Sequence, residues 1–440
     1  MTLLTDSVGP YDVGATAFTL PVHPPIASGT ACLRDAQGQL APALLAEQVD
    51  FIAYYPTPQS SQAKFKKGLY WLTRPLKDTV GGYSHFITIS PWVLWPAVVF
   101  FGAGLKAPVY KNSPPLRSPD HQWSLVLFSH GLGSNGMTYS QMCSHLASHG
   151  HVVLAFEHHD GSGPIFRPRS SHIGRKKPMY FLRSSQVAWD NSQSSDADER
   201  SRFRLRVEQL AFRHLEIYLG YQAFSQLVTS GEFGALRERD GMPLDPTWVG
   251  GSWVQCSKVA IIGHSFGGGT VTSMISTPPP EGLTITPIPI SHAVALDPWL
   301  DPLSENPEPS TGTQPTNRNL PQLLVVTSER IALWPDHFAR LLGIVRNWIG
   351  STHVSFCDFP VMLPPVIRSS SARQILRVIN TLVLDFINDR LAESIDRMGP
   401  RRLETETKRR SWYRFWAERE TAQLVGEPGN IVVHIEPPKL

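Results

Sequence analysis

Apolar runs and amphipathic stretches alternate along the middle of the chain. The run WSLVLFSHG at 123–131 predicts a buried strand. The next segment, TYSQMCSHLASHG at 138–150, has apolar residues at helical spacing and ends on a glycine, and HVVLAFEHHD at 151–160 predicts a second strand. Strand, helix and strand in this order form the unit of a parallel sheet, because parallel neighbours need a crossover connection.

The same alternation continues downstream. Three more apolar runs predict strands, at 258–263, 291–297 and 321–329. Helical spacing predicts a long helix from about Ala197 to Thr229 and an amphipathic helix at 371–395. Upstream, the run from Val49 to Pro56 is bounded by proline and polar residues, which favours a strand within an antiparallel edge of the sheet.

The whole pattern predicts an α/β protein with the α/β-hydrolase fold: a doubly wound, mostly parallel sheet with N-terminal antiparallel edge strands and surface insertions. We expect one domain over 1–396, with its core at about 45–395, and a basic-aromatic tail over 397–440. Segment 161–200 is polar and basic, then rich in Ser and Asp, which predicts an excursion outside the sheet. Two proline-rich segments predict surface insertions, at 277–289 and 304–321.

Composition narrows the class of protein. The 440 residues are 41% hydrophobic and 18% charged, as in an ordinary globular protein, and a net charge of +3 gives no reason to expect nucleic-acid binding. The N-terminal residues show neither a secretory signal nor a glycine at position 2 for myristoylation. The cysteines are too widely spaced for a zinc motif and too few for a disulfide scaffold; they are Cys32, Cys143, Cys256 and Cys357. We therefore expect a cytoplasmic protein.

A serine between glycines follows the strand at 258–263. The sequence Gly263-His264-Ser265-Phe266-Gly267 fits Gly-x-Ser-x-Gly, the tight strand-to-helix turn that presents a nucleophilic serine above a sheet. The glycines are needed because strand and helix backbones come too close for side chains there. An apolar run before the motif and small residues after it supply the required context.

A serine hydroxyl needs a base, and the base needs an orienting acid. In this fold class the order along the chain is Ser, then Asp or Glu, then His. Asp297 ends a predicted strand and is the expected acid, with Asp301 as the competing one. For the base, His353 in a predicted loop is favoured over His337 in a predicted helix and over the remote His434; a loop can reach across to the serine.

The oxyanion hole needs two N–H donors. One is expected from Phe266, the residue after the nucleophile, and the other from Leu132 in the loop His130-Gly131-Leu132-Gly133. The cluster His158-His159-Asp160 is not expected to bind a metal, because adjacent side chains at a strand end point to opposite faces. We expect no metal and no cofactor.

Four segments resemble the platelet-activating factor acetylhydrolase family, in its plasma and intracellular type II forms. They are FSHGLGSNGMTYSQMCSHLASHGHVVLAFEHHD at 128–160, KVAIIGHSFGGGTV at 258–271, ALDPWLDPL at 295–303 and GSTHVSFCDFP at 350–360. Two upstream segments match more loosely, DFIAYYPT at 50–57 and YKNSPPLR at 110–117. The resemblance thus runs from about residue 45 to about residue 370.

The resemblance implies an α/β-hydrolase that cleaves short or oxidised sn-2 acyl chains from phospholipids without calcium. The roles it implies are nucleophile for Ser265, acid for Asp297, base for His353, and oxyanion N–H donors for Leu132 and Phe266. The chain departs from the family in its proline-rich insertions, in its long C-terminal tail, and in His159, where the family tends to have arginine.

Two other functions stay open. One is a broader carboxylesterase or polyester hydrolase, because GHSFGGG is also typical of cutinase-like enzymes. The other is a catalytically silent hydrolase fold that serves as a lipid-binding or interaction module. Preference for phospholipids over simple esters separates the first from the family function, and failure of a fluorophosphonate probe to label Ser265 would favour the second.

Two segments are candidates for contact with a membrane surface. Phe86–Leu105 has the length of a membrane span, but its two prolines and two internal glycines argue against one regular helix. Its aromatic residues fit an interfacial surface, as the resemblance also implies, or a cap packed on the core; they are Trp92, Trp95, Phe100 and Phe101. The basic-aromatic tail segment at 407–420 either contacts the same surface or docks on the body of the protein.

Overall fold

We describe the fold from a computed structural model of the 440-residue chain. The residues that the structure describes are 2–4, 8–34, 37–60, 62, 67–118, 120–167, 178–189, 203–232, 234–239, 244–281, 285–303, 321–329, 346–348, 353–362, 371–399, 405–408, 421–424 and 431–432. His337, His434, all but the last residue of the insertion at 304–321, and the aromatic part of the tail therefore lie outside the described residues.

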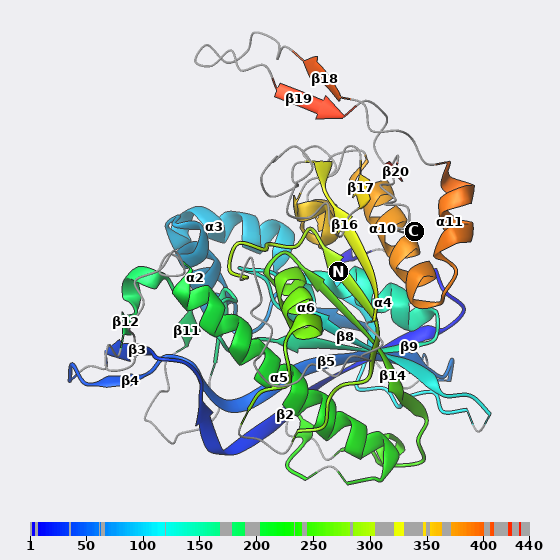
Figure 1. The fold of residues 1–440 in the computed structure, drawn as a ribbon, viewed down its shortest axis with the longest axis horizontal. Helices are drawn as coiled ribbons and strands as arrows, with labels where there is room; N and C mark the ends of the chain where they lie inside the picture. The colour runs from blue at the N-terminus through cyan, green and yellow to red at the C-terminus, as the bar shows by residue number, and fades with distance from the viewer. Residues whose placement is uncertain are drawn as a thin grey trace, which may run out of the picture.

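One large mixed sheet forms the centre of the molecule (Figure 1). Its strands are, in spatial order, β1 (Thr2–Leu3), β7 (Leu105–Lys111), β2 (Asp12–Ala27), β5 (Leu45–Thr57), β9 (His151–Glu157), β8 (Trp123–Ser129), β14 (Val254–His264), β15 (Ile290–Leu296), β16 (Gln322–Thr327), β17 (Arg346–Trp348) and β20 (Ile431–Val432). Two further strands pair at its edge, β6 (Lys67–Tyr70) with β7 and β13 (Arg237–Glu238) with β2.

The direction of the strands divides this sheet into two parts. From β9 through β8, β14, β15 and β16 to β17, all neighbours are parallel. On the N-terminal side, β2 and β5 pair antiparallel over most of their length, and β5 pairs antiparallel with β9. The predicted parallel sheet with an antiparallel N-terminal edge is confirmed.

Helices cover both faces of the sheet. The helix α5 (Arg204–Thr229) and α6 (Phe266–Ser276) lie on one face, and α4 (Ser140–Ser148) and α10 (Ala372–Ile387) lie on the other (Figure 1). Strand β8 shows how the sequence produces this arrangement. Its side chains alternate between the two apolar cores: Leu125 and Leu127 pack towards α5, whereas Val126 and Phe128 pack towards α4. Burying each such side chain contributes roughly 1.5–3 kcal/mol, so both faces must be apolar.

The predicted helix at 371–395 is wrong in one respect, because the structure has two helices there. The helix α10 ends at Ile387, and α11 (Leu391–Met398) follows it. Asp389 between them has φ +59°, and the Asn388 side chain donates to the Leu384 carbonyl at 2.9 Å. Asn and Asp stop helices in this way, since their short polar side chains bond to the backbone and tolerate left-handed φ.

Smaller elements lie outside the main sheet. In segment 161–200, the described strands are β10 (Ile165–Phe166), β11 (Met179–Tyr180) and β12 (Ala188–Trp189). The strands β10 and β11 pair with each other, and β12 pairs with β3 (Ala31–Arg34), which also pairs with β4 (Leu40–Pro42). In the tail, β18 (Thr405–Lys408) pairs with β19 (Thr421–Leu424).

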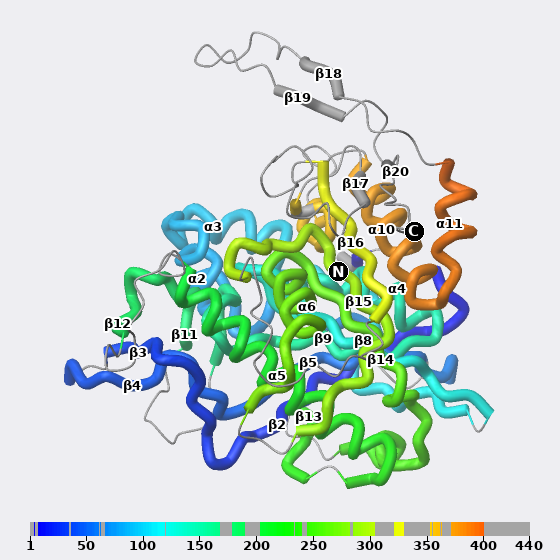
Figure 2. Tube along the Cα trace, viewed as in Figure 1, coloured from blue at the N-terminus to red at the C-terminus, as the bar shows by residue number. Residues whose placement is uncertain are grey.

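The segment Phe86–Leu105 contains the end of α2 (Leu76–Ile87), then α3 (Pro91–Ala97) and a π-helical turn η1 (Val98–Gly102). In the view of Figure 2, α2 and α3 lie side by side on the left of the molecule, on the other side from α11. Among the described residues, no single helix has the length and apolar character to cross a membrane. The pair Leu76–Ile87 and Pro91–Gly102 passes that test only together, and it is bent by 120°.

Candidate active site

Ser265 lies at a sharp turn between the end of β14 and the start of α6. Its φ of +57° and ψ of −117° are strained for a residue with a side chain. The turn is crowded as well: a Cβ placed on Gly263 would lie 2.1 Å from the Gly267 carbonyl oxygen, and one on Gly267 would lie 2.1 Å from the Ser129 carbonyl oxygen. This crowding is why the Gly-x-Ser-x-Gly pattern requires glycine at both ends.

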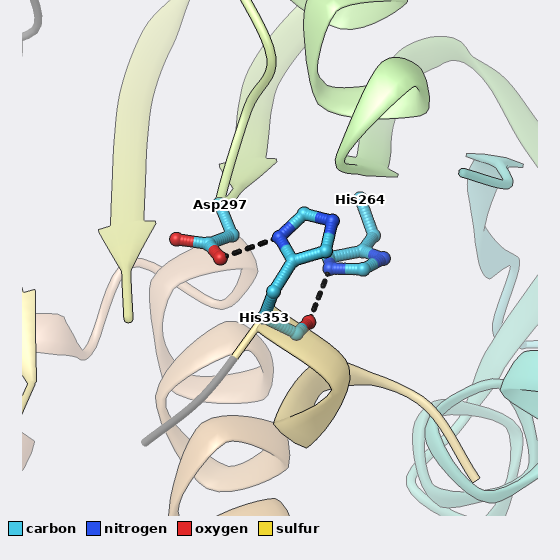
Figure 3. A group of neighbouring side chains, drawn as sticks. All are labelled: His264, Asp297 and His353. Atoms are coloured by element: carbon cyan, nitrogen blue, oxygen red, sulfur yellow. Dashed lines mark hydrogen bonds and ion pairs between the residues drawn. The ribbon is translucent and has the colours of Figure 1, made fainter. Parts of the chain in front are cut away.

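The structure brings Ser265, His353 and Asp297 together although they lie far apart in the sequence. His353 Nε2 is 2.8 Å from Ser265 Oγ, and His353 Nδ1 is 2.7 Å from Asp297 Oδ2. The second of these contacts is drawn in Figure 3. Because a carboxylate only accepts hydrogen bonds, Nδ1 carries the proton, and Nε2 is left to accept the serine hydroxyl.

Asp297 follows the last residue of β15, at the carboxyl end of the strand, and is fully buried. Besides His353, it accepts hydrogen bonds from the Ser328 backbone N–H at 2.7 Å and the Ser328 hydroxyl at 2.8 Å. These donors offset the cost of burying the carboxylate charge. Asp297 therefore makes the contact with His353, while Asp301 lies four residues further along the loop. Sequence reasoning missed Ser328, whose position directly after β16 was the available signal.

The loop that carries His353 is anchored a few residues later by Asp358. His353 begins a short 3-10 helix, η7 (His353–Phe356). Asp358 is buried and accepts from Ser140 Oγ at 2.6 Å, from Trp71 Nε1 at 3.0 Å and from the backbone N–H of Gln141 at 3.2 Å. Burial raises the pKa of Asp358 to about 7, although the donors Ser140 and Trp71 act in the opposite direction. The anchor thus joins the base loop to the start of α4.

The loop with the expected oxyanion donor lies against the nucleophile. A Cβ on Gly131 would be 3.0 Å from Ser265 Cβ, and Gly133 has φ +68° with the Phe86 ring packed against it. Within the described part of the chain, no acceptor bonds the backbone N–H of Leu132 or of Phe266. Neither group is therefore occupied by a protein acceptor, as an oxyanion hole requires.

A buried ion pair also contacts this loop. Arg213 in α5 pairs with Asp160 at 2.8 Å and donates to the His130 carbonyl at 2.7 Å and to Ser162 Oγ at 2.6 Å. Its guanidinium also lies over the Phe266 ring, 4.4 Å from the ring centroid. Arg213 therefore contacts the backbone two residues before Leu132 and the side chain of Phe266, the other expected donor. This role could not be predicted from the sequence, since an arginine within an amphipathic helix is normally exposed.

The neighbouring histidines bind different partners. His158 Nδ1 is 2.7 Å from Glu216, and its Nε2 is 2.9 Å from Ser129 Oγ. His159 Nδ1 is instead 3.1 Å from the Gln48 carbonyl. The two rings thus share no position that one metal ion could occupy.

His264, Asp297 and His353 offer three possible ligand atoms within 4.8 Å of one another (Figure 3). Their nitrogens are already engaged, however. His264 Nε2 lies 2.9 Å from the His353 carbonyl oxygen and His264 Nδ1 lies 2.7 Å from the Tyr139 hydroxyl, while both nitrogens of His353 bond to Asp297 and Ser265. The donor set is therefore that of a hydrogen-bonded serine site rather than a metal centre.

A cavity of about 720 Å³ lies elsewhere, between the sheet and the start of α2. Apolar and charged side chains line it, among them Met137, Leu72, Lys106, Glu157 and Arg239. Neither Ser265 nor any residue that contacts its hydroxyl borders this cavity. We therefore do not assign this cavity as the substrate-binding site.

A strained serine after a central parallel strand, with aspartate and histidine at the same sheet edge, defines an α/β-hydrolase. A family model described as "Platelet-activating factor acetylhydrolase, isoform II" matches residues 2–394. The chain belongs to this family, and the predicted family and fold class are confirmed.

Individual relatives agree with the family match. The chain is 28% identical to the platelet-activating factor acetylhydrolase of Canis lupus familiaris and 29% identical to that of Bos taurus, over 319 residues in each case. Each match covers 70% of this chain and 62% of the relative, so the chain spans less than two thirds of their length. Among solved structures, a ferulic acid esterase from Streptomyces cinnamoneus is similar, with a TM-score of 0.47 and 15% identity over 88% of this chain and 92% of that one.

Proposed function

We propose that this chain is a serine hydrolase that cleaves short or oxidised sn-2 acyl esters of phospholipids without calcium. One observation carries the proposal: His353 lies between Ser265, at 2.8 Å, and the buried Asp297, at 2.7 Å. Membership of the acetylhydrolase family supports the substrate class. The family resemblance implies catalysis without calcium, so we expect activity to persist in EDTA.

In the proposed mechanism, His353 Nε2 takes the proton of Ser265 as the serine oxygen attacks the ester carbonyl. Asp297 accepts from Nδ1–H, which holds the ring in the required tautomer and stabilises the imidazolium that forms. The negative charge that develops on the carbonyl oxygen is met by the N–H groups of Leu132 and Phe266. Loss of one such donor typically costs about 2.7–4 kcal/mol of transition-state stabilisation.

The second half of the reaction reverses these proton transfers. His353 gives its proton to the leaving lysophospholipid oxygen, and an acyl group remains on Ser265. A water molecule then loses a proton to His353 and attacks the acyl carbonyl. The acid product leaves and the serine recovers its hydrogen.

The test is hydrolysis of two phosphatidylcholines, one with an sn-2 acetyl group and one with a long sn-2 chain, by wild type and Ser265→Ala in EDTA. We expect fast acetate release, slow or no cleavage of the long chain, and a loss of at least about 10⁴-fold in Ser265→Ala. If p-nitrophenyl butyrate is cleaved and neither lipid is, the substrate class is wrong and the broader carboxylesterase is right. If a fluorophosphonate probe fails to label Ser265, the chain is a silent binding module.

We also propose that α3 and η1 bind a membrane surface beside the site. Trp92 and Phe100 are 82% and 79% exposed, and Val93, Val99 and Phe101 extend the same apolar surface. We call these five residues the apolar patch. Aromatic and aliphatic side chains grouped in this way are typical of interfacial segments. The patch is joined to the site through α2, whose Phe86 packs on Gly133. A cytoplasmic location stays a prediction from the sequence.

Co-flotation with phosphatidylcholine vesicles tests this contact. We expect Trp92→Ser/Phe100→Ser to reduce the bound fraction several-fold and to leave p-nitrophenyl butyrate hydrolysis in solution unchanged. Leu40→Ser is the matched control, since Leu40 is a large apolar residue that is exposed on a different part of the surface. Equal flotation of the double variant and wild type would contradict the proposal.

A further inference from the structure

The side chains of Ser265, His353 and Asp297 position one another. The loop that holds His353 and the loop that holds the expected oxyanion donor Leu132 also need fixed backbones. The His353 side chain is 42% exposed, so packing alone does not hold it. The glycine of the oxyanion loop, Gly131, comes so close to Ser265 that its backbone position determines where the donors lie. Two buried residues outside the triad, Tyr139 and His264, join these loops.

Three hydrogen bonds form a continuous chain between the loops. The His264 ring lies 2.9 Å from the His353 carbonyl oxygen through Nε2 and 2.7 Å from the Tyr139 hydroxyl through Nδ1. The Tyr139 oxygen accepts the backbone N–H of Gly131 at 3.1 Å. Figure 3 shows the His264 ring beside His353, with the bond to the carbonyl drawn. This series of hydrogen bonds therefore runs from the base to the oxyanion loop and passes directly beside the nucleophile.

Which atom donates in each of these three hydrogen bonds is determined by the His353 carbonyl at one end and the Gly131 N–H at the other. A carbonyl oxygen only accepts, so His264 Nε2 must carry a hydrogen. A neutral imidazole has one hydrogen, so Nδ1 must accept from the Tyr139 hydroxyl, and the Tyr139 oxygen is left to accept from Gly131. Burial, with His353 adding to it, holds the pKa of His264 well below its ordinary value, which keeps the ring in the neutral form that the chain requires.

We propose that Tyr139 and His264 are positioning residues that set the distance between the base loop and the oxyanion loop around Ser265. This inference rests on the proposed function of Ser265 and His353. Neither Tyr139 nor His264 has to touch the substrate; each acts through a backbone group of a neighbouring loop. Displacing a catalytic group by about 1 Å can lower the rate about 100-fold, so such a link has a large effect on turnover and a small one on binding.

A purely structural role makes a different prediction. Tyr139 is fully buried and its ring packs on Phe128, with centroids 4.7 Å apart, so removing the whole side chain would disturb the core. Tyr139→Phe removes only the hydroxyl and keeps the ring. Its matched control is Tyr54→Phe, because Tyr54 is equally buried in the same core and its hydroxyl, among the described residues, bonds only to Met137 Sδ, at 3.4 Å.

The first experiment measures kcat, KM and the melting temperature of both variants with p-nitrophenyl butyrate, and the rate of fluorophosphonate labelling. We expect Tyr139→Phe to lower kcat and the labelling rate about 10- to 100-fold with KM within about 2-fold of wild type. Tyr54→Phe should keep the wild-type kcat whatever its melting temperature. Equal kcat in Tyr139→Phe and Tyr54→Phe would overturn the inference.

The second experiment uses three variants of His264 to separate its hydrogen bond to the His353 carbonyl from its hydrogen bond to Tyr139. His264→Gln keeps an amide N–H where Nε2–H donates to the His353 carbonyl, His264→Asn keeps an acceptor where Nδ1 faces Tyr139, and His264→Leu keeps neither. We expect both amides to retain more kcat than His264→Leu, even where their melting temperatures are equal. Losses of kcat that simply follow the melting temperature in all three would show a structural role instead.

Failure of the proposed function gives a distinct result. If wild type itself is not labelled by the fluorophosphonate, Ser265 is not an activated nucleophile, and both proposals are overturned. If wild type is labelled and hydrolyses the ester, but Tyr139→Phe matches it in both assays, only the positioning role is overturned.

Discussion

The carboxyl edge of the sheet and the apolar patch depart from the usual distribution of side chains in opposite directions. Around Ser265 the fully buried groups include charged or ionisable ones, such as Asp297, Arg213 and Asp358. On α3 and η1, large apolar side chains such as Trp92 and Phe100 are exposed instead. A folded chain normally does the reverse at both places.

The two departures differ in what they cost the fold. A buried charge is tolerated only when hydrogen bonds or an opposite charge match it, and removing the match costs several kcal/mol. An exposed apolar side chain only forgoes a burial worth about 1.5–3 kcal/mol, and the fold does not depend on it. Substitutions at the sheet edge should therefore change activity or stability strongly, whereas those in the patch should change only what the protein binds.

The largest effect is expected for Asp297→Asn. The amide would donate to His353 Nδ1, which forces the hydrogen onto Nε2 and leaves no lone pair for the serine proton. We expect kcat for p-nitrophenyl butyrate to fall about 10⁴-fold with KM little changed. The competing acid supplies the control, because Asp301→Asn should stay within about 3-fold of wild type. A larger loss in Asp301→Asn than in Asp297→Asn would reverse the assignment of the acid.

The next effect concerns stability. Arg213→Met removes the cation from a fully buried pair and leaves Asp160 uncompensated, which should cost about 3–5 kcal/mol of unfolding free energy. Lys258→Met removes one partner of an ion pair with Asp389 in which both side chains are 50% exposed, and should cost at most about 1 kcal/mol. Urea denaturation measures both. Equal losses would mean that burial of the Arg213 pair has no energetic consequence.

A smaller effect is expected from pH at Asp358. Burial raises the pKa of this carboxyl from 3.8 to about 7, so the folded state keeps a proton that the unfolded state has already lost. The stability that this group contributes is present below about pH 4 and is lost as the pH rises through about 7. Asp358→Asn cannot ionise and removes this contribution to the pH dependence.

The measurement is the melting temperature of wild type and Asp358→Asn between pH 5 and 8. We expect the variant to gain relative to wild type as the pH rises. For each protein, the quantity compared is the change in melting temperature between pH 5 and pH 8. A single pH would not suffice, since the amide also changes the hydrogen bonds to Ser140 and Trp71. Parallel curves would show that Asp358 is ionised throughout this range.

The fold and the three side chains that the structure brings together at Ser265 could be predicted because their signals are local. Each central strand is a continuous apolar run, and Gly263 and Gly267 are required by the crowding at a single turn. The aspartate at the end of β15 was predictable for the same reason. The break between α10 and α11 was missed, although the adjacent Asn388 and Asp389 within a helical pattern were its signal.

The groups that support the site could not be predicted in this way. Tyr139 and His264 lie 125 positions apart, and Arg213 and Asp160 lie 53 apart, so only the folded sheet brings them together. Periodicity describes which face of an element a residue occupies, not which distant residue it meets. Arg213 is the clearest case, since the helical pattern of α5 continues through it without any change that marks a buried charge.

The smallest effect is expected in the apolar patch. Trp92→Ser and Phe100→Ser should each leave the free energy of unfolding within about 0.5 kcal/mol of wild type, because these side chains are already in contact with solvent. By contrast, Phe51→Ala in the fully buried core should cost about 3–5 kcal/mol. Urea denaturation of the purified protein without lipid makes this comparison. A loss above about 2 kcal/mol at Trp92 or Phe100 would show that the patch packs against the protein, and the reason for assigning it to a membrane surface would be gone.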